Sequence, residues 1–179
     1  MKLSEYFSND VKDGASVPVA ETQEKRPAAI PFANSILVVL DGSDAALRAL
    51  KMAVNIKSCL PNARLSAAFV VDTVSMNMLQ QMRVFIAEER EIFEQEIIAK
   101  GERVLDSAFE YARKQDVELE TYMLKGRFSQ AIQKACRELQ CDLLIICGWH
   151  NSSTHKDNSS VERQLVVDHS SCPVLVIKG

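Results

Sequence analysis

The sequence predicts an α/β fold in which one open parallel sheet carries helices on both faces. Strand-like and helix-like segments alternate along the chain, four times strand then helix, before a final strand. This alternation is typical of parallel sheets joined by right-handed crossovers. Several strand-like runs are also continuously apolar, such as ILVVL at 36–40 and DLLIICG at 142–148. Strands that are covered on both faces show this pattern.

The first strand, at 36–40, is followed by the turn sequence DGS and then by a helix. Ser43 or Asp44 can cap this helix, because short polar side chains accept hydrogen bonds from the first free backbone N–H groups. The helix is expected to end near Leu60, where a Pro-Asn pair follows and stops it. The second strand is predicted at 64–72.

A long helical pattern extends from about Gln81 to Lys114, with apolar residues at helical spacing and a charged run on the other side. Its length exceeds that of most helices in globular proteins. We therefore expect a kink near Gly101 or a break before Glu88. The charged run, EEREIFEQE, is interpreted as a solvated helix face.

The remaining elements complete the alternation. The segment DVELETYML alternates apolar and polar residues, as does an edge strand with one wetter face. The other segments are read from apolar periodicity and turn residues, and they are a helix at 126–139, a buried strand at 142–148, a short helix that begins at Ser159 or Ser160, and a last strand at 174–178.

Composition argues against several classes of function. The chain has 179 residues and a formal net charge of −3, which gives no electrostatic case for binding nucleic acid or an anionic membrane. No apolar run is long enough to span a bilayer, and the N-terminus lacks the apolar core of a signal peptide. We therefore expect no membrane insertion and a cytoplasmic location.

Residues 1–34 differ from the rest of the chain. They contain three prolines and mixed charges but no sustained apolar period. A disordered or loosely docked N-terminal tail is expected there, followed by one domain at 35–179.

The sequence contains five cysteines and no CxxC pair, so a structural zinc site is not predicted. Reduced thiols are expected, and Cys172 beside Pro173 is the candidate for a redox role. No Ser/His/Asp or Cys/His grouping has the strand–turn–helix context of a nucleophile. The chain is therefore interpreted as a binding protein rather than an enzyme, with weak ATP hydrolysis left open.

The loop after the strand at 142–148 is the first candidate for a binding site. In open parallel sheets, ligands bind beyond the carboxyl ends of strands and beside helix N-termini, where free N–H groups favour anions. This loop begins at Gly148, is polar, and leads into the helix that starts at Ser159 or Ser160.

From Ser35 to its end, the chain resembles the universal stress protein family. The segments that carry the resemblance are ILVVLDGSDAALRAL, AAFVVD, KGRFSQAIQKACRELQCDLLIICG and DHSSCPVLVIK. The resemblance implies a Rossmann-like α/β domain with a five-stranded sheet of order 3-2-1-4-5. It also implies a homodimer that pairs through the last strand, Val174–Ile177, and stress-linked regulation through an unknown protein partner.

One branch of this family binds ATP through a loop of the form G-x2-G-x9-G-[ST]. Here Gly148 matches the first glycine, but Asn151 stands at the second. The final pair becomes Ser159 and Ser160, or Ser160 and Val161, depending on where a gap is placed. The RQL at 163–165 is similar to the branch that lacks the glycines. The nucleotide loop is therefore interpreted as degenerate.

If an adenine nucleotide binds, the resemblance assigns ribose and base contact to Asp41, and adenine contact to Val70 or Val71. The phosphate contacts would come from Gly148, Asn151, Ser159 and Ser160. Asp41 has an equal alternative as a turn residue bonded to its own backbone. For both valines, simple packing in the core is favoured over contact with adenine. The expected function is a regulatory, homodimeric binding protein. The alternative is an ATP- or adenine-nucleotide-binding switch that uses the serine-rich loop 148–160. No metal site is predicted.

Overall fold

A computed structural model describes residues 33–73, 87–148 and 158–178, with side chains described in these ranges except at 87–90 and 158–160. The predicted tail lies outside the described residues apart from Ala33 and Asn34. Ala33 is buried, and the N–H of Asn34 donates to a carboxylate oxygen of Asp142 at 2.8 Å. The division at residue 35 stays a prediction.

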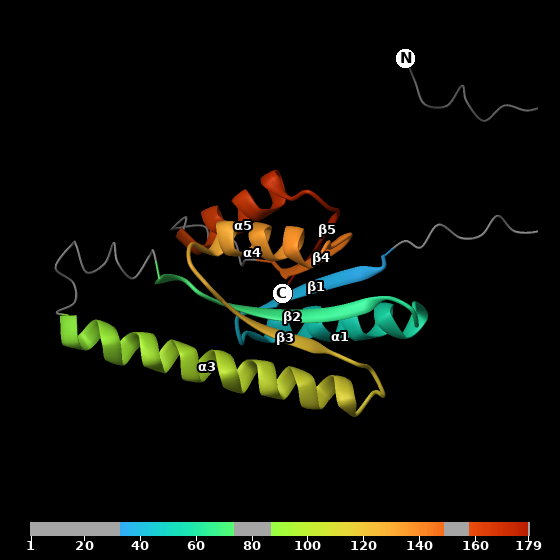
Figure 1. Ribbon diagram of the computed structural model, residues 1–179, viewed down its shortest axis with the longest axis horizontal. Coiled ribbons are helices and arrows are strands. Elements are labelled where there is room, and N and C mark those ends of the chain that lie inside the picture. Colours follow the sequence, from blue (N-terminus) through green and yellow to red (C-terminus); the bar gives the residue numbers. More distant parts are fainter. Residues whose placement is uncertain (1–32, 74–86, 149–157, 179) are drawn as a thin grey trace, which may run out of the picture. The chain divides into compact units, whose positions relative to one another are not determined.

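The described chain forms one sheet of five parallel strands in the order β3-β2-β1-β4-β5, with helices in every connection (Figure 1). The elements are β1 (Ser35–Leu40), α1 (Asp44–Cys59), β2 (Arg64–Val71), α3 (Ala87–Arg113), β3 (Glu120–Lys125), α4 (Phe128–Glu138), β4 (Leu143–Cys147), α5 (Asn158–His169) and β5 (Val174–Ile177). The predicted fold class and strand order are confirmed.

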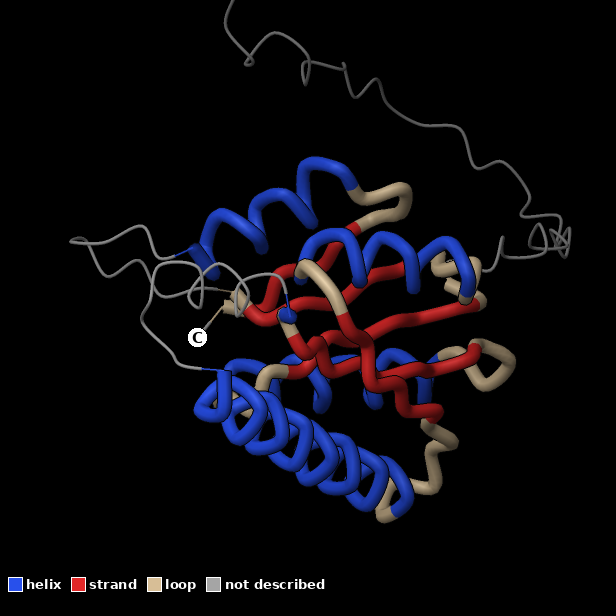
Figure 2. Tube along the Cα trace, turned by 60° about the vertical axis from the view of Figure 1, so that its left-hand side comes forward, coloured by secondary structure: helices blue, strands red, loops and turns tan. Residues whose placement is uncertain are grey.

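The sheet separates two layers of helices (Figure 2), with α1 and α3 on one face and α4 and α5 on the other. Alternate residues of β1 enter the two cores, since successive side chains of a strand point to opposite faces. Val38 and Leu40 pack toward α1 and α3, while Leu37 and Val39 pack toward α4 and α5. All six residues of β1 are buried, as its continuous apolar run predicts.

The helix α1 begins with a capping serine, one of the two capping residues that the sequence predicts. Ser43 is the N-cap, and its hydroxyl accepts a hydrogen bond from the N–H of Ala46 at 3.1 Å. The preceding Gly42 has φ = +82°, a left-handed conformation that glycine adopts without steric cost. This tight turn places the end of β1 directly beneath the first turn of α1.

The third strand begins later than predicted. It starts at Glu120 rather than at residue 116, because Val117 and Leu119 pack into the core on the α1 and α3 face before the strand pairs with β2. The alternating pattern was thus read correctly as an edge strand, but its start was placed four residues early.

Gly101 has a packing role in α3, which continues through it from Ala87 to Arg113. A Cβ built at Gly101 lies 2.6 Å from the Phe69 ring and 2.7 Å from the Met123 side chain. A glycine is therefore needed where the long helix approaches β2 and β3. Within the described residues, no helix is long and apolar enough to cross a membrane.

Replacing Gly101 tests this close approach. We expect Gly101→Ala to lower the free energy of unfolding by about 1–3 kcal/mol, the usual cost of overpacking a well-filled core. Urea denaturation followed by circular dichroism measures the change. At an unobstructed helical site the same substitution would raise stability by about 1 kcal/mol, and that result would contradict the packing role.

Candidate functional site

The carboxyl end of β1 carries an ion pair that links it to α5. The Arg163 Nη2 atom lies 2.6 Å from the Asp41 Oδ2 atom. The Arg163 side chain is 14% exposed and that of Asp41 is 32% exposed, so water screens the pair only partly. Asp41 follows the central strand and Arg163 lies in the second turn of α5, so the contact joins segments 122 residues apart.

Asp41 also accepts hydrogen bonds from its own turn and from β4. The Ser43 N–H donates to Oδ1 at 2.9 Å, and the Cys147 thiol lies 3.4 Å from Oδ2. Burial, the largest single effect, raises the pKa of Asp41, but the hydrogen bonds from Ser43 and Cys147 and the charge of Arg163 together lower it. The carboxylate is therefore ionised and well satisfied.

Burial and the neighbouring Asp41 carboxylate raise the pKa of Cys147, which is consistent with a neutral thiol that donates to Asp41. The turn contact predicted for Asp41 is thus present, and it is accompanied by two longer-range partners.

Phe128, the first residue of α4, helps to hold the Arg163 guanidinium in place. The guanidinium carbon lies 5.7 Å from the centre of the Phe128 ring, within the range of a cation–π contact. Glu162, which precedes Arg163 in α5, accepts a hydrogen bond from the Ser129 N–H at 3.1 Å. Because the N-cap of α4, Arg127, makes no side-chain cap bond, Glu162 supplies an anion at that helix end.

The two valine alternatives lie on opposite faces of β2. Leu40 pairs with Phe69 in the parallel register, so Asp41 and Val70 follow at the same level. Val70 is half-buried on the face of α4 and α5. Val71 is fully buried in the core beneath α1 and α3. An adenine contact for either valine stays a prediction.

Gly148 lies at the end of β4 and continues the pairing with β5. Its N–H donates to the Ile177 carbonyl at 2.6 Å, and an added Cβ would lie 3.1 Å from that oxygen. The close approach of β5 is therefore a structural reason for this glycine. Ser159 and Ser160 belong to the first turn of α5, with side chains outside the description, and Asn151 lies outside the described residues.

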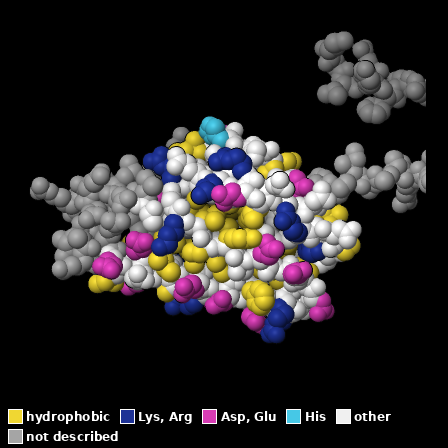
Figure 3. Space-filling view, viewed as in Figure 1, with side chains coloured by type: hydrophobic (Ala, Val, Ile, Leu, Met, Phe, Trp, Pro, Cys, Tyr) yellow, Lys and Arg dark blue, Asp and Glu magenta, His cyan; other side chains and the backbone are white. Residues whose placement is uncertain are grey.

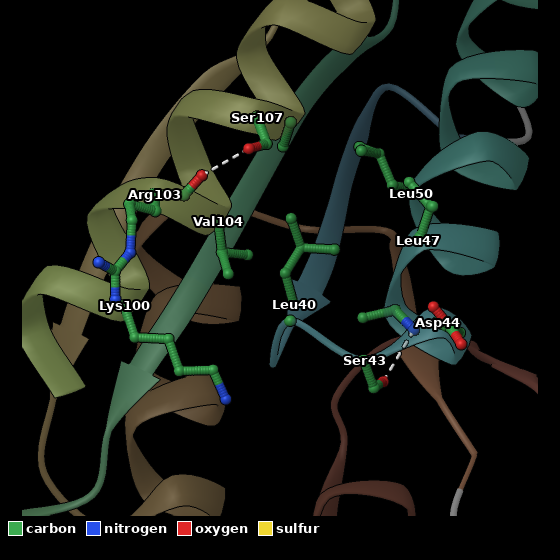
Figure 4. Close-up of a pocket in the computed structure, with 12 residues that line it drawn as sticks. Leu40, Ser43, Asp44, Leu47, Leu50, Lys100, Arg103, Val104 and Ser107 are labelled. Carbon is green, nitrogen blue, oxygen red and sulfur yellow. Dashed lines mark hydrogen bonds between the residues drawn. The ribbon is translucent and has the colours of Figure 1, made fainter. Parts of the chain in front are cut away.

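A cavity of 320 Å³ lies between α1 and α3, on the face of the sheet opposite to α4 and α5 (Figure 4). Leu40, Leu50 and Val104 form apolar walls, while Lys100 and Arg103 extend from α3 at its rim. Of the predicted nucleotide-binding residues whose side chains the structure describes or that are glycine, namely Asp41, Val70, Val71 and Gly148, none lines this cavity. In the turn after β1, Asp41 therefore contacts α5 through Arg163, while Gly42 and Ser43 line the cavity.

Arg163 is the residue of this site that the sequence interpretation missed. Its segment, RQL, was noted only as a mark of the branch without glycines. Nothing in local spacing indicates that an arginine in the last helix reaches the end of the first strand. A half-buried arginine opposite an acidic strand end can either compete with a ligand for the carboxylate or donate to a ligand's anionic group.

The ionised state of Asp41 gives a pH-dependent prediction. We expect Asp41→Asn to lower the free energy of unfolding at pH 7 by roughly 1.5–3 kcal/mol, as for a hydrogen bond to a charged group. Because folding lowers the pKa of Asp41, its contribution is present above the unfolded pKa of about 3.9 and is lost as the pH falls through the folded value. The difference between wild type and variant should therefore shrink below about pH 4.

Denaturation curves at several pH values measure this difference. The matched control is Glu110→Gln, which breaks a pair with Arg113 whose side chains are 48% and 67% exposed. That control should change stability by at most about 0.5 kcal/mol. A variant at Asp41 that is as mild as the control, at every pH, would contradict a structural role for the ion pair.

Comparisons with known proteins bear on the whole domain. The family model described as the universal stress protein family matches residues 33–178. A universal stress protein family structure from Burkholderia pseudomallei is 27% identical and covers 84% of this chain and 98% of its own, with a TM-score of 0.63. Comparison with curated proteins gives no match.

Two further structures show the same fold with a nucleotide present. A universal stress protein in complex with cAMP is 21% identical, covers 82% of this chain and 97% of its own, and has a TM-score of 0.61. The universal stress protein from Archaeoglobus fulgidus in complex with dAMP is 18% identical, covers 80% of this chain and 97% of its own, and has a TM-score of 0.57. Because the family model matches residues 33–178 of the 179 residues, the chain belongs to the universal stress protein family.

Proposed function

We propose that this protein is a regulatory, homodimeric binding protein of the cytoplasm whose nucleotide site is occupied by its own Arg163. The observation that carries the proposal is the ion pair of 2.6 Å between Arg163 and Asp41. Asp41 is the acidic residue that the family resemblance assigns to ribose and base contact. In this chain the carboxylate is already neutralised, so a nucleotide would have to displace an arginine that is held by Phe128 and Cys147.

Binding without turnover is the activity proposed. All five cysteines are free thiols, which suits the reducing cytoplasm. On the face drawn in Figure 3, acidic and basic side chains are interspersed and neither sign dominates. This distribution favours a protein partner over a polyanion.

A second candidate, an adenine-nucleotide switch, is favoured by the related structures that contain cAMP or dAMP. In this alternative Arg163 turns from Asp41 to the phosphate. Ser159 and Ser160, in the first turn of α5, then supply N–H and hydroxyl donors at a helix N-terminus.

Calorimetric titration of ATP and AMP into the wild type and into Arg163→Ala separates the two candidates. If Arg163 blocks the site, the wild type shows no tight binding, and the variant gains affinity by about tenfold or more, equivalent to about 1.4 kcal/mol. If Arg163 serves the phosphate, the wild type binds, and Arg163→Ala, Asp41→Ala and Ser160→Ala each weaken binding. Tight stoichiometric binding by the wild type would overturn the first proposal.

The homodimer is proposed to form along β5. Both β3 and β5 are edges of the sheet, but β3 carries Glu120 and Lys125, which discourage edge pairing. The four residues of β5 are all apolar and all only half-buried. An apolar, half-exposed edge is the surface that a second copy of this strand can cover.

A lysine on this edge tests the dimer. We expect Val176→Lys to give a monomer by light scattering coupled to size-exclusion chromatography, because two charged edges would face each other. The matched control is Val161→Lys on α5, where the valine is 47% exposed and is not part of the β5 edge strand, and this variant should remain dimeric. Circular dichroism confirms that both fold. A dimer that persists in folded Val176→Lys would rule out pairing through β5.

A further inference from the structure

Three of the five thiols gather at the amino ends of the strands, on the face of α4 and α5. Cys136 lies in α4 and is 3% exposed, as part of the core on that face. Cys141 follows α4 and Cys172 precedes β5, and both are half-buried against this same core. They are brought together by the fold, since Cys172 is remote in sequence from the other two.

The contact between Cys136 and Cys141 follows from the way α4 ends. Gln140 has φ = +49°, and its N–H donates to the Arg137 carbonyl at 3.2 Å. The Cys141 N–H donates to the Cys136 carbonyl at 2.8 Å. These paired bonds around a left-handed residue form a Schellman motif, which usually brings the side chains at these two outer positions into contact. Here the two side chains are thiols.

The surroundings of Cys141 favour its thiolate. The hydrogen bond from the Cys136 thiol has the largest effect and lowers the pKa of Cys141. Burial and the Asp142 carboxylate oppose it, but the Ser35 hydroxyl and the Arg64 guanidinium lower the pKa further, so that it lies below the ordinary value. Arg64 is held there by its own bond to the Leu139 carbonyl at 3.1 Å. The same contact with Cys141, followed by burial, raises the pKa of Cys136. One thiol is therefore prepared to react, while its neighbour keeps its proton.

We propose that Cys141 and Cys136 form a peroxide-responsive dithiol, in which Cys141 is oxidised first and Cys136 resolves it to a disulfide. The Cys141 thiolate attacks one oxygen of hydrogen peroxide, the O–O bond breaks, and the hydroxide released takes up a proton to become water. The Cys136 sulfur then loses its proton and attacks the sulfur of the resulting sulfenic acid. The S–S bond forms and a second water leaves. Two electrons pass from the thiols to the peroxide.

We assign the first oxidation to Cys141 rather than to Cys172 for two reasons. The backbone hydrogen bonds that end α4 hold Cys141 in place, and the Arg64 charge acts on its thiol. The disulfide would close only the short segment 136–141, so it would add little stability through loop closure. Its effect would be local, at the Leu139 carbonyl to which Ser35 and Arg64 both donate.

Peptide mapping of the full chain after treatment with hydrogen peroxide tests the proposal. Arg137 lies between the two cysteines, so trypsin separates them and only a disulfide keeps the two peptides joined. We expect the joined peptides, lighter by two hydrogens and released by dithiothreitol, with fragmentation assigning the bond to Cys141 rather than to Cys147 in the same peptide. A disulfide that uses Cys172, or none at all, would overturn the assignment.

Variants test the order of the two steps. In Cys136→Ser, Cys141 should accumulate as a sulfenic acid that dimedone traps, and in Cys141→Ser the disulfide should be lost. Cys59, exposed on α1 and without a neighbouring thiol in the described chain, is the internal control. It should be oxidised more slowly than Cys141 in the wild type, a comparison that needs no variant to fold. Equal rates at Cys59 and Cys141 would contradict the activation of Cys141.

Discussion

The central strand β1 is buried on both faces and paired on both sides, and the rest of the fold is arranged around this constraint. β2 and β4 satisfy its backbone groups, and the two helix layers cover its side chains. Polar chemistry is therefore possible only at the two ends of the strand. Ser35 begins it, beside Asp142 and Leu139, and Asp41 follows its last residue, beside Arg163 and Cys147. With six residues, β1 separates these ends by roughly 20 Å at about 3.3 Å per residue.

At the carboxyl end, α5 is fixed by two consecutive residues that point to different partners. Glu162 supplies an anion to the N-terminus of α4, and Arg163 neutralises the carboxylate after β1. The helix that opens a phosphate site in nucleotide-binding α/β folds is here tied to its own protein. Under the proposed function, the same contacts that stabilise the domain compete with a nucleotide for Asp41. The proposal thus connects stability to function, since loosening the ion pair would free the carboxylate.

At the amino end the chemistry is different. The thiols of Cys136, Cys141 and Cys172 lie against one core, and Arg64 and Ser35 converge on the carbonyl that ends α4. The oxidation proposed at this end and the ligand exchange proposed at the other are separated by the length of β1. The cavity between α1 and α3 is a third feature, and it lies across the sheet from both.

The sequence by itself determined the class of fold, the element order and most boundaries, because apolar periodicity and capping residues are local. It predicted a cap at Ser43 or Asp44, of which Ser43 is the cap observed, as well as the end of α1 near Leu60 and the edge position of β3. It located Asp41 and Gly148 at strand ends without showing what they contact. Only the tertiary structure decided that Arg163 meets Asp41, that Val70 and Val71 face different cores, and that three cysteines pack against one core. These contacts join residues far apart in the chain, and their geometry follows from strand order and register, which local patterns do not encode.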